Sequence, residues 1–586
     1  MYRAGLILTI VFVISIHFFY YPKWTKHHTE ATISWDVSGY YMYLPAIFIY
    51  KDIKECKFKD EILKKYKPTY DFQQGFLHEA SGNYVMKYSC GQAIMLSPGF
   101  AIAHLWAQND SRYPADGFSH PYQFCISMWT LIIATIGLIF LWKILRVYFS
   151  EKVTLLGILG IVLGSNYIAY SAISGAMTHN TLFTLYAILI YLTIKFYRKP
   201  SLALAFGIGI SVGFAALIRP TELISCLIPI LWGLPSLTKT AFSQRLQFFK
   251  DHWKKLMLAV ILVILVGSIQ LMYWKYATGE FIVYSYEDQG FDWFSPHILD
   301  GLFSYRSGWL IYSPLMIFAV LGFIPLYKEK KAIFNSTFIF TCLFTYIAFA
   351  WSIWWYGGSL GQRTMVQIYP VLAFPLCAMI YIILNTSVLW KAISGIFIAL
   401  FLYANFWFTH QAHLGGKMHV GRMSKAYFWE TLFTYKMDRQ DLKLLDHLRH
   451  LYKGEPQDIV EITKDTTTHI LNSEIQFTPK ITVPESALPE DYDWIRVEAE
   501  VLYTEKEWDI WKMTQLVLEP IADNKPIRRN MGRVHHQVDP NKQTVFYIDI
   551  KKPKVPFDRL ETYFWHVKND KKMTIKNTRV LTFKNE

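Results

Sequence analysis

The sequence predicts a polytopic α-helical membrane protein of about eleven transmembrane helices, followed by a C-terminal β-sandwich domain outside the membrane. Composition is the first reason: the chain is 53% hydrophobic and only 18% charged, which is more apolar surface than one soluble core can bury. The second is that most apolar residues occur in blocks close to the roughly 20 residues that cross a bilayer as a helix. The third is that, late in the chain, the pattern changes to short runs in which apolar and polar residues alternate.

The apolar blocks define the expected spans. The first, Leu6 to Phe19, is not followed by a small-x-small cleavage site, so we expect an uncleaved span rather than a signal peptide. The other expected spans are Tyr122 to Leu145, Val153 to Ile173, Thr181 to Phe196, Leu202 to Leu217, Leu223 to Leu234, Leu256 to Tyr276, Trp309 to Leu326, Phe334 to Trp351, Met365 to Leu384 and Val388 to Phe408.

Positive charge is concentrated on alternate connectors, and this predicts the topology. The residues concerned are Lys143, Arg146, Lys152, Lys195, Arg198, Lys199, Lys239, Arg245, Lys250, Lys254, Lys255, Lys328, Lys330, Lys331 and Lys391. The positive-inside rule places them in the cytoplasm, so the N-terminus is expected inside and the C-terminal domain outside, in the periplasm of a cell with an inner membrane. The same distribution explains most of the net charge of +14, and nucleic-acid binding is not expected.

Three regions are expected. Residues 1–409 form the transmembrane domain, with a long first outer loop at 22–121; residues 410–457 form a helical linker, which includes a helical-looking stretch from Tyr435 to Lys453. Residues 458–586 form the β-sandwich, because apolar and polar residues alternate in runs such as Trp494 to Leu502 and Thr544 to Ile550.

The first outer loop contains one apolar stretch, Ala93 to Trp106, which is interrupted by Pro98 and is too short to cross. We expect an interfacial or re-entrant helix there. Cys56 and Cys90 fall in the same loop, and in an oxidising compartment they form either a disulfide or two free thiols; the sequence leaves both open.

Three arginines stand out because the short outer connectors otherwise have almost no cations: Arg219, Arg306 and Arg363. A charge at a helix end in a membrane needs compensation. One form of compensation is snorkelling, or pairing with a carboxylate such as that of Glu222. The other is an anionic ligand, and a phosphate suits the planar guanidinium group.

Two further residues lie in the first loop. Asp36 follows the first span in Thr-Ile-Ser-Trp-Asp-Val-Ser-Gly-Tyr-Tyr, where it is either a helix cap or a site residue. Lys87 stands in Val-Met-Lys-Tyr-Ser-Cys-Gly; taken alone, it is one of many solvated loop lysines.

Together these features resemble the GT-C superfamily, the integral-membrane glycosyltransferases that use polyprenyl-phosphate sugars and include the protein O-mannosyltransferase and lipid A aminoarabinose transferase branches. The resemblance covers residues 1–409 and rests on the order and topology of the motifs; the C-terminal part resembles only a generic carbohydrate-binding jelly roll. It implies a donor sugar on a polyprenyl phosphate in the surrounding membrane lipids, and a glycan, lipid or protein acceptor outside the cytoplasm.

The resemblance also implies roles for residues. Asp36 matches the catalytic acidic residue and Lys87 the lysine that contacts the lipid phosphate. His179 occupies the second outer loop, where relatives often have another acidic or polar residue. This departure, and the lack of an Asp-x-Asp pair in the membrane part, weaken the case for a metal site. We expect no cofactor to be required, and a divalent metal with unassigned ligands stays open as the alternative.

We expect Asp36 to remove the acceptor proton while cations hold the phosphate, which gives direct displacement with inversion. The expected clamps are Lys87, Arg306 and Arg363, with His179 and Arg219 as further candidates; Trp355 and Tyr356 either stack on sugar or prenyl groups or anchor the chain at the interface.

Other carboxylates in outer loops, namely Asp116, Glu287, Asp288 and Asp292, are either solvated or site residues. Two other functions fit the same features: a transporter or flippase of a lipid-linked sugar, and a non-catalytic membrane scaffold.

Overall fold

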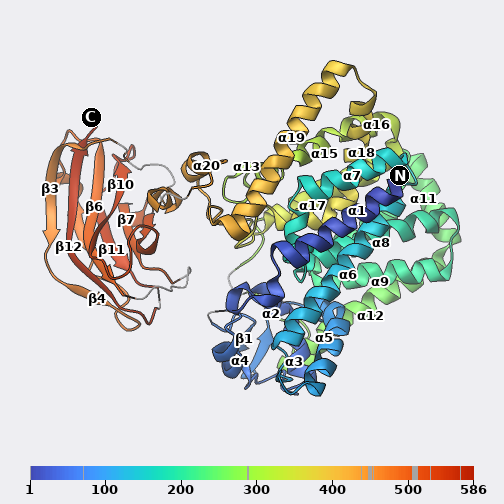
Figure 1. Cartoon of the computed structure of the whole chain (residues 1–586), viewed down its shortest axis with the longest axis horizontal. Coiled ribbons are helices and arrows are strands. Elements are labelled where there is room, and N and C mark those ends of the chain that lie inside the picture. The colour runs from blue at the N-terminus through green and yellow to red at the C-terminus, as the bar shows by residue number, and fades with distance from the viewer. Residues whose placement is uncertain are drawn as a thin grey trace. The chain divides into compact units, whose positions relative to one another are not determined.

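The computed structural model describes residues 2–69, 71–286, 289–436, 439–446, 452, 454–504, 512–527, 529–567 and 569–585. The chain divides into two compact units, residues 1–414 and 415–586 (Figure 1). The first unit is almost entirely helical and the second is built from β-strands. The predicted combination of a helical membrane unit and a C-terminal β-sandwich domain is confirmed.

Seven helical segments of the described chain are long and apolar enough to cross a membrane. They are Tyr2–Thr25 (α1, Tyr2–Ser15, with the turns after it), His120–Leu145 (α6), Thr178–Arg198 (α8), Trp253–Thr278 (α12), Lys331–Ala350 (α17), Arg363–Asn385 (the turn η7, Arg363–Ile368, and α18, Tyr369–Asn385) and Val388–Gly415 (α19, Val388–His410, with the turn after it).

The other expected spans are shorter or broken. They correspond to α7 (Glu151–Gly164), α9 (Leu202–Ile218), η5 with α10 (Pro220–Cys226 and Leu227–Leu231), and α14, η6, α15 and α16 (Trp309–Tyr312, Pro314–Met316, Ile317–Leu321 and Phe323–Glu329). In the last group the helix stops at Tyr312, because Pro314 cannot donate the hydrogen bond that a continuous helix needs. The count of eleven spans therefore stays a prediction.

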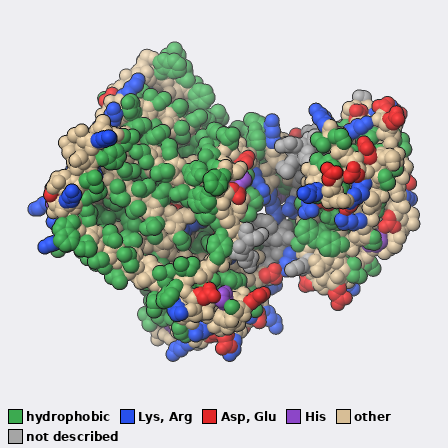
Figure 2. Space-filling view, turned by 180° about the vertical axis from the view of Figure 1, so that it is seen from behind, with side chains coloured by type: hydrophobic (Ala, Val, Ile, Leu, Met, Phe, Trp, Pro, Cys, Tyr) green, Lys and Arg blue, Asp and Glu red, His purple; other side chains and the backbone are tan. Residues whose placement is uncertain are grey.

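Apolar side chains face outward over much of the helical unit. Of the most apolar stretch of α12, only 17% is buried within the protein. Figure 2 shows the result as a wide hydrophobic surface, with lysines and arginines mainly near its margins. Such a surface is stable in lipid and not in water, so the chain is a multi-pass membrane protein.

The first long loop folds into a small subdomain beside the ends of the helices (Figure 1). It contains α2 (Asp36–Tyr41), α3 (Tyr43–Phe48), α4 (Lys59–Tyr66), the hairpin of β1 (Gly75–His78) and β2 (Asn83–Met86), and α5 (Gly91–Asn109). At 19 residues α5 is longer than the stretch we expected, and it is not among the seven candidate spans. Both Cys56 and Cys90 are buried free thiols, so the disulfide alternative does not hold.

The second unit is a sandwich of two antiparallel sheets. One has the order β10-β6-β12-β3 with β4 beside β12, and the other β5-β11-β7-β8 with β9 beside β7. The strands are β3 (Gln457–Asp465), β4 (His469–Leu471), β5 (Ile481–Pro484), β6 (Trp494–Tyr503), β7 (Gln515–Ala522), β8 (Lys525–Pro526), β9 (Asn530–Arg533), β10 (Thr544–Lys551), β11 (Arg559–Trp565) and β12 (Met573–Lys584).

Side chains point alternately to the two faces of each strand, and those that point inward form the core of the sandwich. Ile495, Val497 and Ala499 of β6 point inward and meet Leu516 and Leu518 of β7. Before the sheets come α20 (Lys425–Thr431), a 3-10 turn (Arg439–Leu442) and α21 (Lys443–Asp446). Part of the helical stretch expected at Tyr435 to Lys453 lies outside the described residues. The remaining helices are α11 (Lys239–Asp251) and α13 (Ile298–Phe303), both in the first unit.

Candidate active site

Asp36 is the first residue of the short helix α2, and its carboxylate is held by two donors from distant parts of the chain. Arg363 Nη2 lies 2.7 Å from Asp36 Oδ2, and the Tyr88 hydroxyl donates to Asp36 Oδ1 at 2.8 Å. Its side chain is 27% exposed, so the carboxylate is anchored and still reachable. The sequence proposed Asp36 and Arg363 separately; the structure places them in contact.

The turn before α2 sets the direction of Asp36. Trp35 has a φ of +49°, a backbone conformation that a non-glycine residue adopts only where its surroundings impose it. Its amide is held by the carbonyl of Pro68 at 2.9 Å. On the next turn Gly39 leaves room for the Tyr88 ring, since a Cβ there would lie only 2.7 Å from it. The loop therefore fits closely around the carboxylate.

Arg363 is positioned by the loop at 357–363, which earlier helices hold. The Tyr170 hydroxyl accepts from the amide of Leu360 at 3.0 Å, and Asn166 Nδ2 donates to the Leu360 carbonyl at the same distance. Gly361 has a φ of +62°, and a Cβ there would meet Tyr312 at 2.9 Å, so both the conformation and the space require glycine. The Gly-Gly-Ser-Leu-Gly-Gln-Arg segment is thus a built turn that presents Arg363.

Burial by itself would raise the pKa of Asp36. The positive charge of Arg363, the hydrogen bonds from Tyr88 and Arg363, and the charge of Lys87 together lower it below its ordinary value of 3.8. Asp36 is therefore a carboxylate at neutral pH. The pKa of Tyr88 moves the other way, because burial and the neighbouring Asp36 charge both oppose ionisation, and Tyr88 remains a hydrogen-bond donor.

Lys87 lies beside this pair on the strand-to-helix connection. Its ammonium is 6.0 Å from the ring centres of both Tyr88 and Tyr286, and its backbone carbonyl accepts from Ser285 Oγ at 2.7 Å. The Tyr40 and Tyr88 rings pack with centroids 4.4 Å apart. A set of tyrosines, Tyr40, Tyr88 and Tyr286, thus surrounds the charged groups, and the sequence analysis missed all three.

The signal for two of these tyrosines is present in the sequence: Tyr40 and Tyr88 lie within the two loop motifs that contain Asp36 and Lys87. Tyrosines are so frequent in this chain, with 38 in all, that their position alone does not single them out.

His179 is the second residue of α8 rather than part of a loop, and its side chain is fully buried. Its Nδ1 lies 2.9 Å from Gln367 Oε1, Gln367 Nε2 donates to Glu222 Oε1 at 2.6 Å, and Tyr186 donates to Glu222 Oε2 at 2.7 Å. Glu222 therefore belongs to a buried chain with His179. In the described part of the protein, Arg363 Nε and His179 Nε2 are buried nitrogens without a hydrogen-bond partner.

The remaining two arginines lie against aromatic rings. The Arg306 guanidinium is 3.5 Å from the centre of the Trp355 ring, and that of Arg219 is 5.7 Å from the centre of Tyr356. The Tyr356 hydroxyl donates to the Ala348 carbonyl at 2.6 Å. Both rings thus orient an arginine. Arg219 follows α9 directly, whereas Arg306 lies in the segment between α13 and α14.

The acidic candidates of the other loops have different surroundings. Asp116 accepts from Lys65 Nζ and the Tyr66 hydroxyl and closes a turn through the amides of Phe118 and Ser119. Asp292 pairs with His297 at 3.1 Å. Glu287 and Asp288 lie outside the described residues. Within the described ranges no group of three or more His, Cys, Asp or Glu side chains is arranged to hold a metal ion.

Residues 118–273 match the sequence profile of the family described as dolichyl-phosphate-mannose-protein mannosyltransferase. The match covers less than half of the chain; it includes His179 and Arg219 and leaves out Asp36, Lys87 and Arg363. A solved structure that resembles the chain is the Archaeoglobus fulgidus oligosaccharyltransferase in its apo form, at 9% identity and a TM-score of 0.43. The similarity covers 78% of this chain and 62% of that one. No curated protein matches the sequence.

Proposed function

We propose that this chain is a GT-C-type membrane glycosyltransferase that moves a sugar from a polyprenyl phosphate to a hydroxyl of a glycan, lipid or protein acceptor. One observation carries the proposal: a single anchored carboxylate, Asp36, lies in direct contact with Arg363 and near Lys87. A transfer from a phosphate carrier needs one base and several cations, and this cluster supplies both. The match of residues 118–273 to a mannosyltransferase family supports the same reaction class.

In the proposed reaction the acceptor oxygen attacks the anomeric carbon as the bond from that carbon to the phosphate oxygen breaks. The polyprenyl phosphate leaves with the bonding electrons, and the acceptor proton passes to Asp36. Because attack comes from the face opposite the leaving group, the anomeric configuration inverts. The cations offset the charge that develops on the phosphate, so the leaving group needs no general acid.

The ion pair between Asp36 and Arg363 has a role in this scheme. When no sugar donor is bound, Arg363 stabilises the negative charge of Asp36 and makes Asp36 a weak base. A bound phosphate would share the Arg363 guanidinium, whose Nε has no hydrogen-bond partner in the described part of the chain. Asp36 would then become more basic only when the donor is in place, which protects the donor from premature reaction.

The C-terminal sandwich is proposed to bind the acceptor. On β11 the outward Trp565 ring lies nearly parallel to that of Phe477, at 5° and with centroids 6.1 Å apart. Lys480 donates to the Glu561 carboxylate at 2.7 Å on the same sheet. Flat aromatic rings beside charged hydrogen-bonding groups suit the apolar faces and hydroxyls of sugars.

The proposed location is a bacterial-type inner membrane, with the N-terminus in the cytoplasm and both the Asp36 cluster and the sandwich outside. The charge bias of the connectors supports this orientation.

The decisive experiment reconstitutes the full-length protein in proteoliposomes with a panel of polyprenyl-phosphate sugars and acceptors, and compares wild type with Asp36→Asn. A general base contributes about 10²- to 10⁴-fold to the rate, and we expect a loss of that size. Asp60→Asn is the matched control, because Asp60 is an exposed carboxylate of the same loop, and its rate should equal that of wild type. Unchanged transfer by Asp36→Asn would rule out the base, and lipid translocation without transfer would indicate a flippase.

A further inference from the structure

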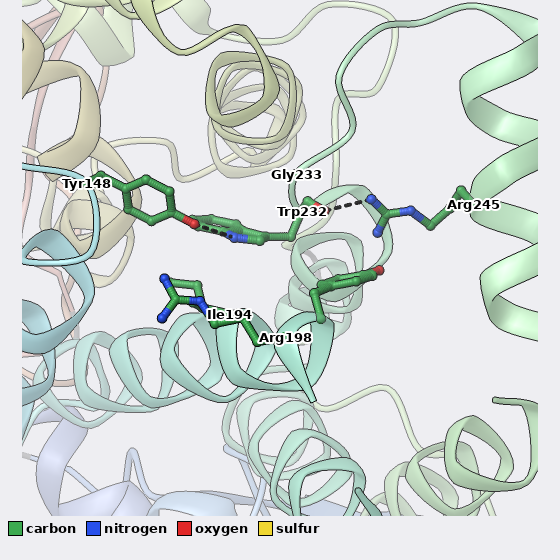
Figure 3. A pocket seen from close by; sticks show the side chains of 7 residues that line it. Tyr148, Ile194, Arg198, Trp232, Gly233 and Arg245 are labelled. Carbon is green, nitrogen blue, oxygen red and sulfur yellow. Dashed lines mark hydrogen bonds between the residues drawn. The ribbon is translucent and has the colours of Figure 1, made fainter. Parts of the chain in front are cut away.

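A second site lies at the far end of α8. A pocket of about 220 Å³ is lined by seven residues: Tyr148, Ile194, Tyr197, Arg198, Trp232, Gly233 and Arg245 (Figure 3). They come from the last turn of α8, the segment after α6, the turn after α10, and α11. The helix α8 has 21 residues, so about 30 Å of helix separates this pocket from His179 at the other end. The two sites are therefore distinct.

The pocket walls are aromatic and held by hydrogen bonds. Trp232 Nε1 donates to the Tyr148 hydroxyl oxygen at 3.2 Å, as the dashed line in Figure 3 shows. Tyr197 donates to the Pro229 carbonyl at 2.6 Å. These contacts fix the rings before any ligand arrives. Among the residues that the structure describes, the Tyr148 hydroxyl only accepts a hydrogen bond, so its O–H can donate to a ligand in the pocket.

Two arginines face this space and differ in their bonding. Arg245 Nη2 donates to the Trp232 carbonyl at 2.8 Å, and its guanidinium lies 4.3 Å from the centre of the Tyr197 ring. Arg198 is exposed, and its guanidinium has no hydrogen bond or ion pair with any residue that the structure describes. Arg245 is therefore a fixed part of the pocket wall, whereas Arg198 offers its guanidinium N–H donors to a ligand.

The surroundings are basic. Lys195 and Lys199 flank Arg198, and α11 carries Lys239 and Lys250. The one carboxylate on α11, Asp251, already accepts from Gln247 Nε2 at 2.8 Å. A site with guanidinium and hydroxyl donors and a positive field recognises an anion, and a tetrahedral phosphate matches these donors.

The helix that borders the pocket points to a lipid as the source of that phosphate. Phe242 and Leu246 of α11 are 43% and 58% exposed, and Leu237 just before the helix is 58% exposed. A short helix with outward apolar side chains and interleaved cations is typical of the bilayer interface, where lipid headgroups lie.

We propose that this pocket binds the phosphate headgroup of an anionic membrane lipid. Arg198 and the Tyr148 hydroxyl contact the phosphate, Arg245 and Trp232 hold the wall, and the lipid chains pass beside α11. The site is independent of Asp36 and of any sugar transfer. It goes beyond the proposed function, because it attaches the opposite end of α8 to a particular class of lipid.

The test uses the full-length protein in detergent and measures lipid binding by native mass spectrometry and by the shift of the unfolding temperature. The probes are phosphatidylglycerol, zwitterionic phosphatidylcholine and inorganic phosphate. The variant is Arg198→Gln, which removes an exposed side chain that has no hydrogen bond or ion pair with the described residues and so leaves the fold intact. Lys199→Gln is the control, since it removes one neighbouring charge that does not line the pocket.

We expect wild type and Lys199→Gln to bind phosphatidylglycerol more tightly than phosphatidylcholine, and Arg198→Gln to bind phosphatidylglycerol at least about five-fold more weakly, as the loss of one arginine at a headgroup implies. Equal losses of phosphatidylglycerol affinity in both variants would indicate a diffuse charge effect and would overturn the proposal. Equal binding of phosphatidylglycerol and phosphatidylcholine by wild type would also overturn the proposal. Saturable stabilisation by inorganic phosphate, lost in Arg198→Gln, would overturn the lipid assignment in favour of a soluble phosphate compound.

Discussion

Asp36 and Arg363 are 327 positions apart in the sequence, and their side chains form an ion pair of 2.7 Å. The pair joins the first loop after α1 to the turn before α18. Neither residue is fully exposed, because 27% of the Asp36 side chain and 14% of the Arg363 side chain reach the surface. The ion pair therefore both stabilises the loop and presents the two charges to a ligand.

The first prediction concerns Arg363 as a phosphate ligand. Arg363→Gln should weaken apparent donor affinity about 10- to 100-fold, since a hydrogen bond to a charged group is lost, whereas Arg363→Lys should lose less because it keeps the charge but not the guanidinium fork. The measurement is the KM for the lipid-linked donor at saturating acceptor. Arg112→Gln, which removes an exposed arginine paired with Asp110, should leave this KM unchanged. An unaltered donor KM in Arg363→Gln would contradict the assignment.

The second prediction is a pH dependence of stability. The pKa of Asp36 is lowered on folding, so its contribution is complete above the ordinary value of 3.8 and is lost as the pH falls through the lower, folded value. Wild type should unfold at a higher temperature than Asp36→Asn by a constant margin between pH 5 and pH 8, and the margin should shrink only below about pH 4. Thermal scans across this range give the answer. A margin that already closes near pH 6 would show that Asp36 is not the stabilised carboxylate.

The third prediction concerns the buried chain of Tyr186, Glu222, Gln367 and His179. Gln367→Leu leaves the Glu222 carboxyl and the His179 ring without their shared partner, and should lower the free energy of unfolding by about 3 kcal/mol. Gln247→Leu makes the same replacement at an exposed position, where the side chain bonds Asp251. It should change the free energy of unfolding by less than about 0.5 kcal/mol. Unfolding temperatures of the two variants in one detergent make the comparison, and equal values would refute the network's role.

The fourth prediction concerns the sandwich. Arg496 binds Asp549 through two hydrogen bonds, of 2.7 Å and 3.0 Å, and the Asp549 side chain is fully buried. Removing one partner of a buried pair costs about 3–5 kcal/mol, so Asp549→Ala should sharply destabilise the sandwich within the full-length protein. Limited proteolysis that follows cleavage within residues 458–586 reports on this unit. Asp491→Ala, at a carboxylate 86% exposed, should resist cleavage as wild type does.

The helical unit was predictable because lipid imposes a simple condition on sequence: a span must be apolar over its whole length. This holds for α6 and α12, whose expected and observed bounds nearly coincide. It fails around Pro314, where the sequence stays apolar but the helix is interrupted. The pyrrolidine ring removes a backbone hydrogen bond, and hydropathy carries no information about that loss. Alternation in β6 and β10 indicated the sandwich for a similar reason, since one face of each strand must be buried.

What the sequence determined by itself is a membrane protein with a β-domain after it, and a short set of unusual charges, Asp36, Lys87 and Arg363 among them. Hydropathy and charge are properties of single residues, so they can be read without the fold. Only the tertiary structure decided which charges meet. It joined Asp36 to Arg363 and to Tyr88, bound Glu222 to Gln367 instead of leaving it as a simple partner for Arg219, and seated Arg306 on Trp355. Contacts across hundreds of residues depend on how helices pack, and no local pattern in the chain specifies that packing.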